Sequence, residues 1–162
     1  MEREPVADSP RPPEETDLVT LCRALNARGA RYIVVGGMAV IQQGFLHATD
    51  EIDLLLDNAP QNIENVRSAL EILPDKAILE MQPDDLENYT VVRVADEILV
   101  DLMLSTCGIS YEQAKDEIEW MEIDDVPIPF ATATLLLKMK QTGREKDRLD
   151  LMFLERKIAG QE

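Results

Sequence analysis

The sequence predicts an α/β domain of the α+β type, in which a mixed β-sheet is flanked by helices. Helical segments alternate with short apolar segments along most of the chain, which is typical of strands covered by helices. Two adjoining apolar segments, 90–94 and 98–104, are separated only by Ala95-Asp96-Glu97 and predict a β-hairpin. Since a hairpin is antiparallel, the sheet is mixed.

Each element follows from its local pattern. Asp17 is expected to cap the first helix, which Arg28-Gly29 closes, and Pro60 is expected in the first turn of another. The residues from 76 to 87 fit either a strand or an irregular loop. We expect helices over 17–27, 37–43, 59–73, 109–116, 130–141 and 144–158, and strands over 31–37, 51–57, 90–94, 98–104 and 119–123.

The chain is expected to form one folded domain behind a short tail. Residues 1–16 contain four of the nine prolines and almost no large apolar residue, so we expect a disordered tail there. Residues 17–160 form the expected domain. A length of 162 residues with 45% hydrophobic and 30% charged residues is ordinary for one domain with its own core.

Charge and composition exclude several classes of function. A formal net charge of −16 argues against general affinity for nucleic acid. So much negative charge serves solubility or a basic partner protein. No apolar run approaches the ~20 residues of a membrane span and no apolar signal core is seen, so we expect no membrane partner and a cytoplasmic location. Two distant cysteines and one histidine are too few for a zinc site, so a catalytic metal would be bound by oxygen.

The stretch HATDEIDLLLD, residues 47–57, places two acids on one side of an apolar strand. Strand alternation puts Glu51 and Asp53 on the same face, ~7 Å apart at the backbone. Because two like charges repel at this distance, a hard metal ion or a basic side chain is the expected partner.

Two further features add to this stretch. Gly36-Gly37 end an apolar strand and open a helix, which fits a phosphate-binding turn or simply a tight turn. Asp101 interrupts an apolar strand and needs a cation, several hydrogen-bond donors or a raised pKa. An internal salt bridge with an arginine such as Arg93 is the alternative partner.

In order and spacing, these motifs resemble those of a known superfamily. YIVVGGMAV, HATDEIDLLLD and the later LVDLM are similar to segments of the small bacterial nucleotidyltransferase-like proteins of the DNA-polymerase-beta-like superfamily. That group includes enzymatic components of abortive-infection and toxin–antitoxin systems. The resemblance covers roughly residues 17–154. It extends to LLKMKQTGREKDRLDLMFL, which is similar to the closing helices of the family and has Lys138, Arg144, Lys146, Asp147 and Asp150 at matching places.

The resemblance implies a nucleotidyltransferase fold with C-terminal closing helices and a metal-dependent transfer of a nucleotide from a nucleoside triphosphate to a hydroxyl. Glu51, Asp53 and Asp101 would be the catalytic acids and would bind Mg²⁺ or Mn²⁺. The substrate triphosphate would be bound by Gly36, Gly37, Thr49 and Lys138 or Lys146, although Lys146 equally fits a surface helix pair with Asp150.

A second interpretation is a catalytically inactive module of the same fold. Glu51 and His47 stand where the family usually has aspartate and arginine. Such a module would bind a nucleotide or a partner protein without transferring anything.

Overall fold

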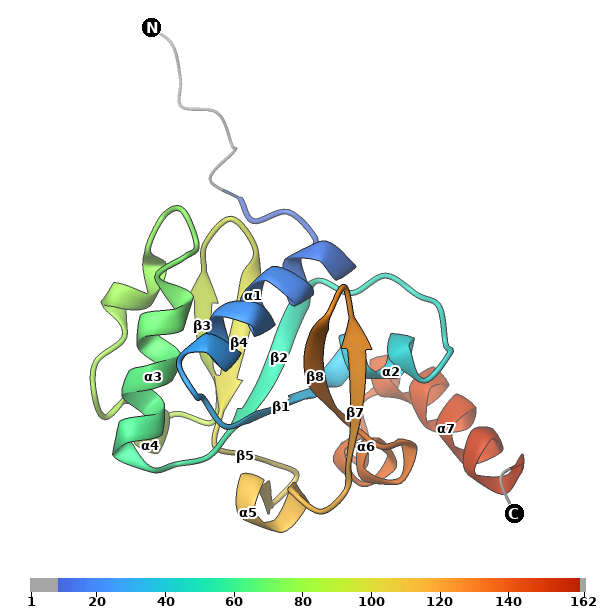
Figure 1. Cartoon of the computed structure of the whole chain (residues 1–162). Coiled ribbons are helices and arrows are strands. Elements are labelled where there is room, and N and C mark those ends of the chain that lie inside the picture. The colour runs from blue at the N-terminus through green and yellow to red at the C-terminus, as the bar shows by residue number, and fades with distance from the viewer. Residues whose placement is uncertain (1–8, 161–162) are drawn as a thin grey trace, which may run out of the picture.

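The computed structural model describes residues 9–160, and Figure 1 shows their arrangement. Residues 1–8 of the expected disordered tail lie outside the described residues. Of the remainder, Pro13 is buried and the Arg11 backbone N–H donates to the Glu97 carbonyl at 3.0 Å. The helices are α1 (Glu15–Ala27), α2 (Gly36–Gln42), α3 (Pro60–Leu70), α4 (Asp85–Asn88), α5 (Tyr111–Ala114), α6 (Ala133–Met139) and α7 (Arg148–Gly160), with 3₁₀ turns η2 (Ala77–Glu80) and η3 (Glu145–Asp147).

A six-stranded mixed sheet forms the centre of the fold, as the sequence predicts. Its order is β3-β4-β2-β1-β8-β7, and a separate two-stranded ribbon joins β5 to β6. The pairs β2–β4 and β1–β8 are parallel, while β1–β2, β3–β4 and β7–β8 are antiparallel. The strands are β1 (Tyr32–Val35), β2 (Glu51–Leu56), β3 (Val92–Ala95), β4 (Leu99–Met103), β5 (Ser105–Thr106), β6 (Ile109–Ser110), β7 (Ile118–Ile123) and β8 (Val126–Ala131).

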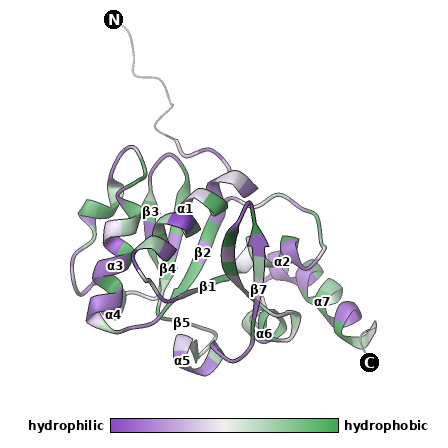
Figure 2. Cartoon of the chain, viewed as in Figure 1, coloured by the Kyte–Doolittle hydropathy of each residue, from purple (hydrophilic) through white to green (hydrophobic). Residues whose placement is uncertain are grey.

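Helices cover both faces of this sheet. α1 and α3 contact each other in front of the sheet in Figure 1, while α2 contacts α6 and α6 contacts α7 behind it. Because both faces are covered, β1 is buried at all four residues and β2 at every residue after Glu51. Figure 2 shows hydrophobic residues gathered in the strands and hydrophilic residues on outer turns of α1 and α3.

Strand β8 is the main element that the sequence analysis missed. The local pattern predicts no element over residues 126–129 and a helix from Phe130, whereas the strand runs to Ala131. Pro127 and Pro129 lower the strand propensity of this segment because proline cannot donate a ladder hydrogen bond. Pairing with β7 along the whole of β8 keeps the segment extended despite the two prolines. On its other side, β8 is in register with β1 only where Val34 stands opposite Phe130, so few ladder hydrogen bonds are needed there. The helix begins after β8, with Thr132 as its cap.

Smaller differences concern the ends of elements. α1 starts at Glu15, because Glu14 and Asp17 form a capping box in which Asp17 is the third helical residue and not the cap. The segment from 76 to 87 is irregular, with only η2 and the start of α4. The expected helix over 109–116 is β6 followed by the short α5, and the final helix begins at Arg148 after η3.

None of the helices in residues 9–160 combines the length and apolar character that crossing a membrane requires.

Candidate active site between strands β2 and β4

Strand pairing places the three predicted acids next to one another. In the parallel pair β2–β4, Asp53 stands directly opposite Asp101. Glu51 lies two residues before Asp53 in β2 and therefore on the same face of the sheet. One carboxylate oxygen from each of the three residues lies within 4.8 Å of the others. The longer side chain of Glu51 therefore reaches the same cluster as the two aspartates.

The paired glycines make room for this cluster. Gly36 has a φ of +69°, and a Cβ built on it would lie 2.0 Å from Asp53 Oδ2. A Cβ on Gly37 would lie 2.5 Å from Thr49 Oγ1, and this hydroxyl is 3.2 Å from the Glu51 carbonyl oxygen that it donates to. Glycine is thus required at the β1–α2 turn because side chains of the β2 segment fill the space that a Cβ would need.

Asp53 is a buried acid without a hydrogen-bond donor among the described residues. Asp53 is 8% exposed to solvent, and Asp101 is 6% exposed. Burial, followed by the negative charges of Glu51 and Asp101, raises the pKa of Asp53 to about 8. The basic neighbours of the cluster therefore do not offset all three carboxylates, and the metal-free protein keeps a proton on Asp53 up to about pH 8.

This raised pKa predicts how the stability of the metal-free protein depends on pH. The folded protein holds the Asp53 proton up to about pH 8, whereas the unfolded chain loses it near 3.8. The free energy of unfolding should therefore be highest below the unfolded value and fall as pH rises between these two values. We expect urea unfolding in EDTA to show a loss of ~1 kcal/mol or more between pH 5 and 8, and a smaller loss in Asp53→Asn.

Asp57→Asn is the matched control, because the pKa of Asp57 is lowered by its hydrogen bond from Arg31 and so does not titrate between pH 5 and 8. This variant should keep the wild-type decline. A decline of equal size in Asp53→Asn would contradict a raised pKa of the buried Asp53 carboxyl.

Arg93 of the edge strand β3 contacts two of the three acids. It stands opposite Asp101 in the β3–β4 register, and its Nε and Nη2 donate to Asp101 Oδ1 and Oδ2 at 2.8 and 2.9 Å. The same Nη2 lies 3.7 Å from Glu51 Oε1. The salt bridge that the sequence left open as an alternative is therefore formed, and it is formed beside Asp53 within the acidic cluster.

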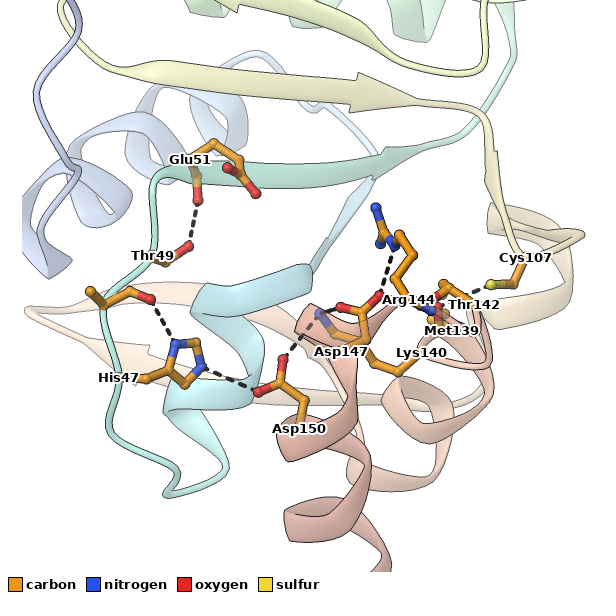
Figure 3. A network of polar contacts seen from close by, with 11 residues as sticks. His47, Thr49, Glu51, Cys107, Met139, Lys140, Thr142, Arg144, Asp147 and Asp150 are labelled. Atoms are coloured by element: carbon orange, nitrogen blue, oxygen red, sulfur yellow. Dashed lines mark hydrogen bonds and ion pairs between the residues drawn. The ribbon is translucent and has the colours of Figure 1, made fainter.

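A second polar network, shown in Figure 3, joins α6 to η3 and α7. Lys140 Nζ lies 3.2 Å from both Asp147 Oδ1 and Asp150 Oδ2. The Thr142 hydroxyl and Arg144 Nε donate to the other oxygen of Asp147 at 2.6 and 2.9 Å. Although burial opposes it, these contacts hold the pKa of Asp147 below its ordinary value. Lys140 lines the same cavity as Asp53, and its positive charge offsets part of the rise in the pKa of Asp53.

Removing Lys140 should destabilise the fold. Its side chain is 14% exposed, and those of Asp147 and Asp150 are 3% and 12% exposed, so Lys140→Met leaves two buried carboxylates short of a counter-ion. We expect a loss of ~3 kcal/mol in the free energy of unfolding, measured in urea at pH 7.

Lys138→Met is the control for this change, because the Lys138–Glu117 pair is 52% and 32% exposed at its two side chains. It should cost no more than ~0.5 kcal/mol. Equal losses in the free energy of unfolding of the two variants would show that the contacts of Lys140 with Asp147 and Asp150 do not stabilise the packing of η3 and α7.

The two networks face each other across a cavity of about 390 Å³. Pockets of ~300 to 1,000 Å³ are typical of sites for small molecules and cofactors. One wall carries the acidic cluster, and the opposite wall carries Lys140, Arg144 and Lys146 together with Asp147 and Asp150. The predicted residues in its lining are Gly36, Gly37, Thr49, Glu51, Asp53, Asp101 and Lys146, and the lining also includes His47, Arg93, Lys140 and Arg144.

Lys138 is the one predicted site residue that the structure does not bring into the cavity lining. Its ammonium group lies 3.0 Å from Glu117 Oε1, and Lys140 occupies the cavity wall. A sequence signal for Lys140 existed, because Lys140 follows the buried Leu136 by four residues and so lies on the apolar face of the helix. A charged residue on that face indicates a buried partner.

The observed architecture is the nucleotidyltransferase fold. The crystal structure of the lincosamide antibiotic adenylyltransferase LnuA with bound lincomycin matches this chain with a TM-score of 0.60. The match covers 90% of this chain and 98% of that one at 17% sequence identity, so the likeness concerns the fold. No protein-family model and no curated protein matches the sequence.

Proposed function

We propose that this protein is a metal-dependent nucleotidyltransferase that moves a nucleotide from a nucleoside triphosphate to a hydroxyl group. The observation that carries the proposal is the convergence of Glu51, Asp53 and Asp101 at one wall of a cavity whose lining also includes Lys140, Arg144 and Lys146. A nucleotidyltransferase fold supports it, since LnuA, an adenylyltransferase, has the same fold.

The acidic cluster fits Mg²⁺ or Mn²⁺. Its three donors are hard carboxylate oxygens within 4.8 Å of one another. Burial, followed by the charges of Glu51 and Asp101, raises the pKa of Asp53, which lacks a hydrogen-bond donor among the described residues. Glu51, Asp53 and Asp101 would hold the ion. When bound, it supplies Lewis-acid stabilisation of the charge that develops on phosphate oxygens.

The chain's own residues would bind the substrate and move the proton. Lys140, Arg144 and Lys146 lie in the cavity lining and would attract the triphosphate, while the Gly36-Gly37 turn would approach its phosphates by backbone N–H groups. The acceptor oxygen would form a bond to the α-phosphorus as the bond to pyrophosphate breaks. Asp101 would orient this acceptor hydroxyl or accept its proton.

The chemical class of the acceptor would distinguish two biological roles for this activity. A protein or RNA acceptor would agree with the toxin–antitoxin role that the sequence resemblance implies. A small-molecule acceptor would parallel LnuA, which is an adenylyltransferase of a lincosamide antibiotic. That likeness makes ATP the first nucleotide to test.

The test is a transfer assay with each of four nucleoside triphosphates labelled at the α-phosphate. The protein is incubated with Mn²⁺ and a bacterial lysate, and label is followed in protein, RNA and small-molecule fractions. We expect label from at least one triphosphate to enter one fraction, and EDTA to prevent it. Nucleotide binding without transfer from any of the four would contradict the enzymatic proposal.

An inactive nucleotide-binding or protein-binding module is the second candidate. One observation favours it: Arg93 already neutralises Asp101 through two hydrogen bonds at 2.8 and 2.9 Å. In that case a nucleotide would raise the melting temperature without any transfer of label.

A further inference from the structure

Arg93 occupies the position where an incoming cation would contact the acidic cluster. Its planar fork engages both oxygens of Asp101, which is the strongest geometry available to an arginine and a carboxylate. It also lies within 3.7 Å of Glu51, so one guanidinium group contacts two of the three acids. A divalent ion needs lone pairs on these same oxygens.

The two partners differ in how freely they can move. The Arg93 side chain is 52% exposed and extends from edge strand β3, whereas the Asp101 side chain is 9% exposed on the inner strand β4. Arginine can therefore turn toward the cavity or solvent without disturbing the core, while Asp101 stays in place. The cavity lining includes Arg93 itself together with the residues proposed to bind the triphosphate.

We infer that Arg93 is the resident counter-ion of the acidic cluster and must leave Asp101 before a divalent ion binds there. This inference rests on the proposed function, because it assumes that the cluster is a metal site. Released from Asp101, the guanidinium group regains a partner when a triphosphate occupies the cavity. Arg93 thereby weakens the binding of a metal ion alone and couples metal binding to nucleotide binding.

The test measures Mn²⁺ binding to the full-length protein without nucleotide, by the EPR signal of free Mn²⁺. Arg93→Gln should bind Mn²⁺ about tenfold more tightly than wild type, a change of ~1.4 kcal/mol in binding free energy. Asp101→Asn should bind it more weakly than wild type.

Arg31→Gln is the matched control. It removes the same charge from a side chain of similar exposure, 49% against 52%, that also pairs with an aspartate, Asp57. Its affinity for Mn²⁺ should stay within about twofold of wild type. Equal affinities of Arg93→Gln and Arg31→Gln would overturn the inference and leave the proposed function standing, whereas an absence of Mn²⁺ binding in all four proteins would overturn both.

A second measurement uses wild type alone and does not depend on the folding of any variant. The Arg93 Nε–Hε resonance in an NMR spectrum reports the hydrogen bond to Asp101. Addition of Mg²⁺ with an α,β-methylene analogue of ATP should shift this resonance. An unchanged resonance at saturating analogue would overturn the inference.

Discussion

Asp53→Asn is expected to abolish nucleotide transfer, by about a thousandfold or more in kcat/KM, while the protein stays folded. Asparagine has nearly the same shape as aspartate, so packing against Gly36 is retained. What is lost is the charge of the buried acid that stands between Glu51 and Asp101, on which a divalent ion and the developing phosphate charge would depend. The measurement is steady-state transfer of α-phosphate label once an acceptor is known.

Asp57→Asn is the control for this change. Asp57 follows the same strand but lies outside the acidic cluster, and its Oδ2 is 2.5 Å from Arg31 Nε. It should transfer nucleotide at the wild-type rate. Circular dichroism of both variants checks the fold. An Asp53→Asn protein that keeps its activity would remove Asp53 from the catalytic machinery, whereas one that is unfolded at neutral pH would give Asp53 a structural role.

Gly36→Ala is expected to cause the largest loss of stability, ~3 kcal/mol or more. A left-handed backbone with φ of +69° costs alanine ~1 kcal/mol by itself. The added Cβ would also lie 2.0 Å from Asp53 Oδ2, so β2 or the β1–α2 turn must shift. Urea unfolding at pH 7 measures the effect.

Gly29→Ala separates these two causes. Gly29 has the same φ of +69°, and a Cβ on it would have no atom within 4 Å, so this change should cost only ~1 kcal/mol. Adding Asp53→Gly to Gly36→Ala should recover part of the extra loss, since the contacting side chain is gone. Equal losses for Gly36→Ala and Gly29→Ala would contradict the close approach of Asp53 to the turn.

Local patterns were sufficient for most elements and for much of the site. Strand alternation placed Glu51 and Asp53 on one face, and the structure brings both together with Asp101. Alternation is a property of the strand itself, so it needs no knowledge of the rest of the fold. The hairpin of β3 and β4 was found for the same reason, because both strands and their turn are adjacent in sequence.

Long-range packing overrides local preference at one strand, and it also decides which of two nearby lysines lines the cavity. The prolines of β8 argued against a strand, and only the pairing with β7 along the whole of β8 makes that segment extended. Lys138 and Lys140 stand two residues apart on one helix and therefore point to different sides. The position of α7, which supplies Asp150, determines which of the two faces the cavity.

By itself, the sequence determined most of the helix and strand segments, the acidic pair of β2, and a glycine turn between β1 and α2. Only the tertiary structure decided that β4 pairs with β2 in a register that sets Asp53 opposite Asp101, with Arg93 opposite Asp101 on the other side. The physical reason is that strand order and register depend on burying both faces of the sheet beneath helices from distant parts of the chain. A single segment carries no record of that choice, so the sequence offered Arg93 only as one possible partner of Asp101, and the fold decided that this pair forms and that the Lys140 network lines the same cavity.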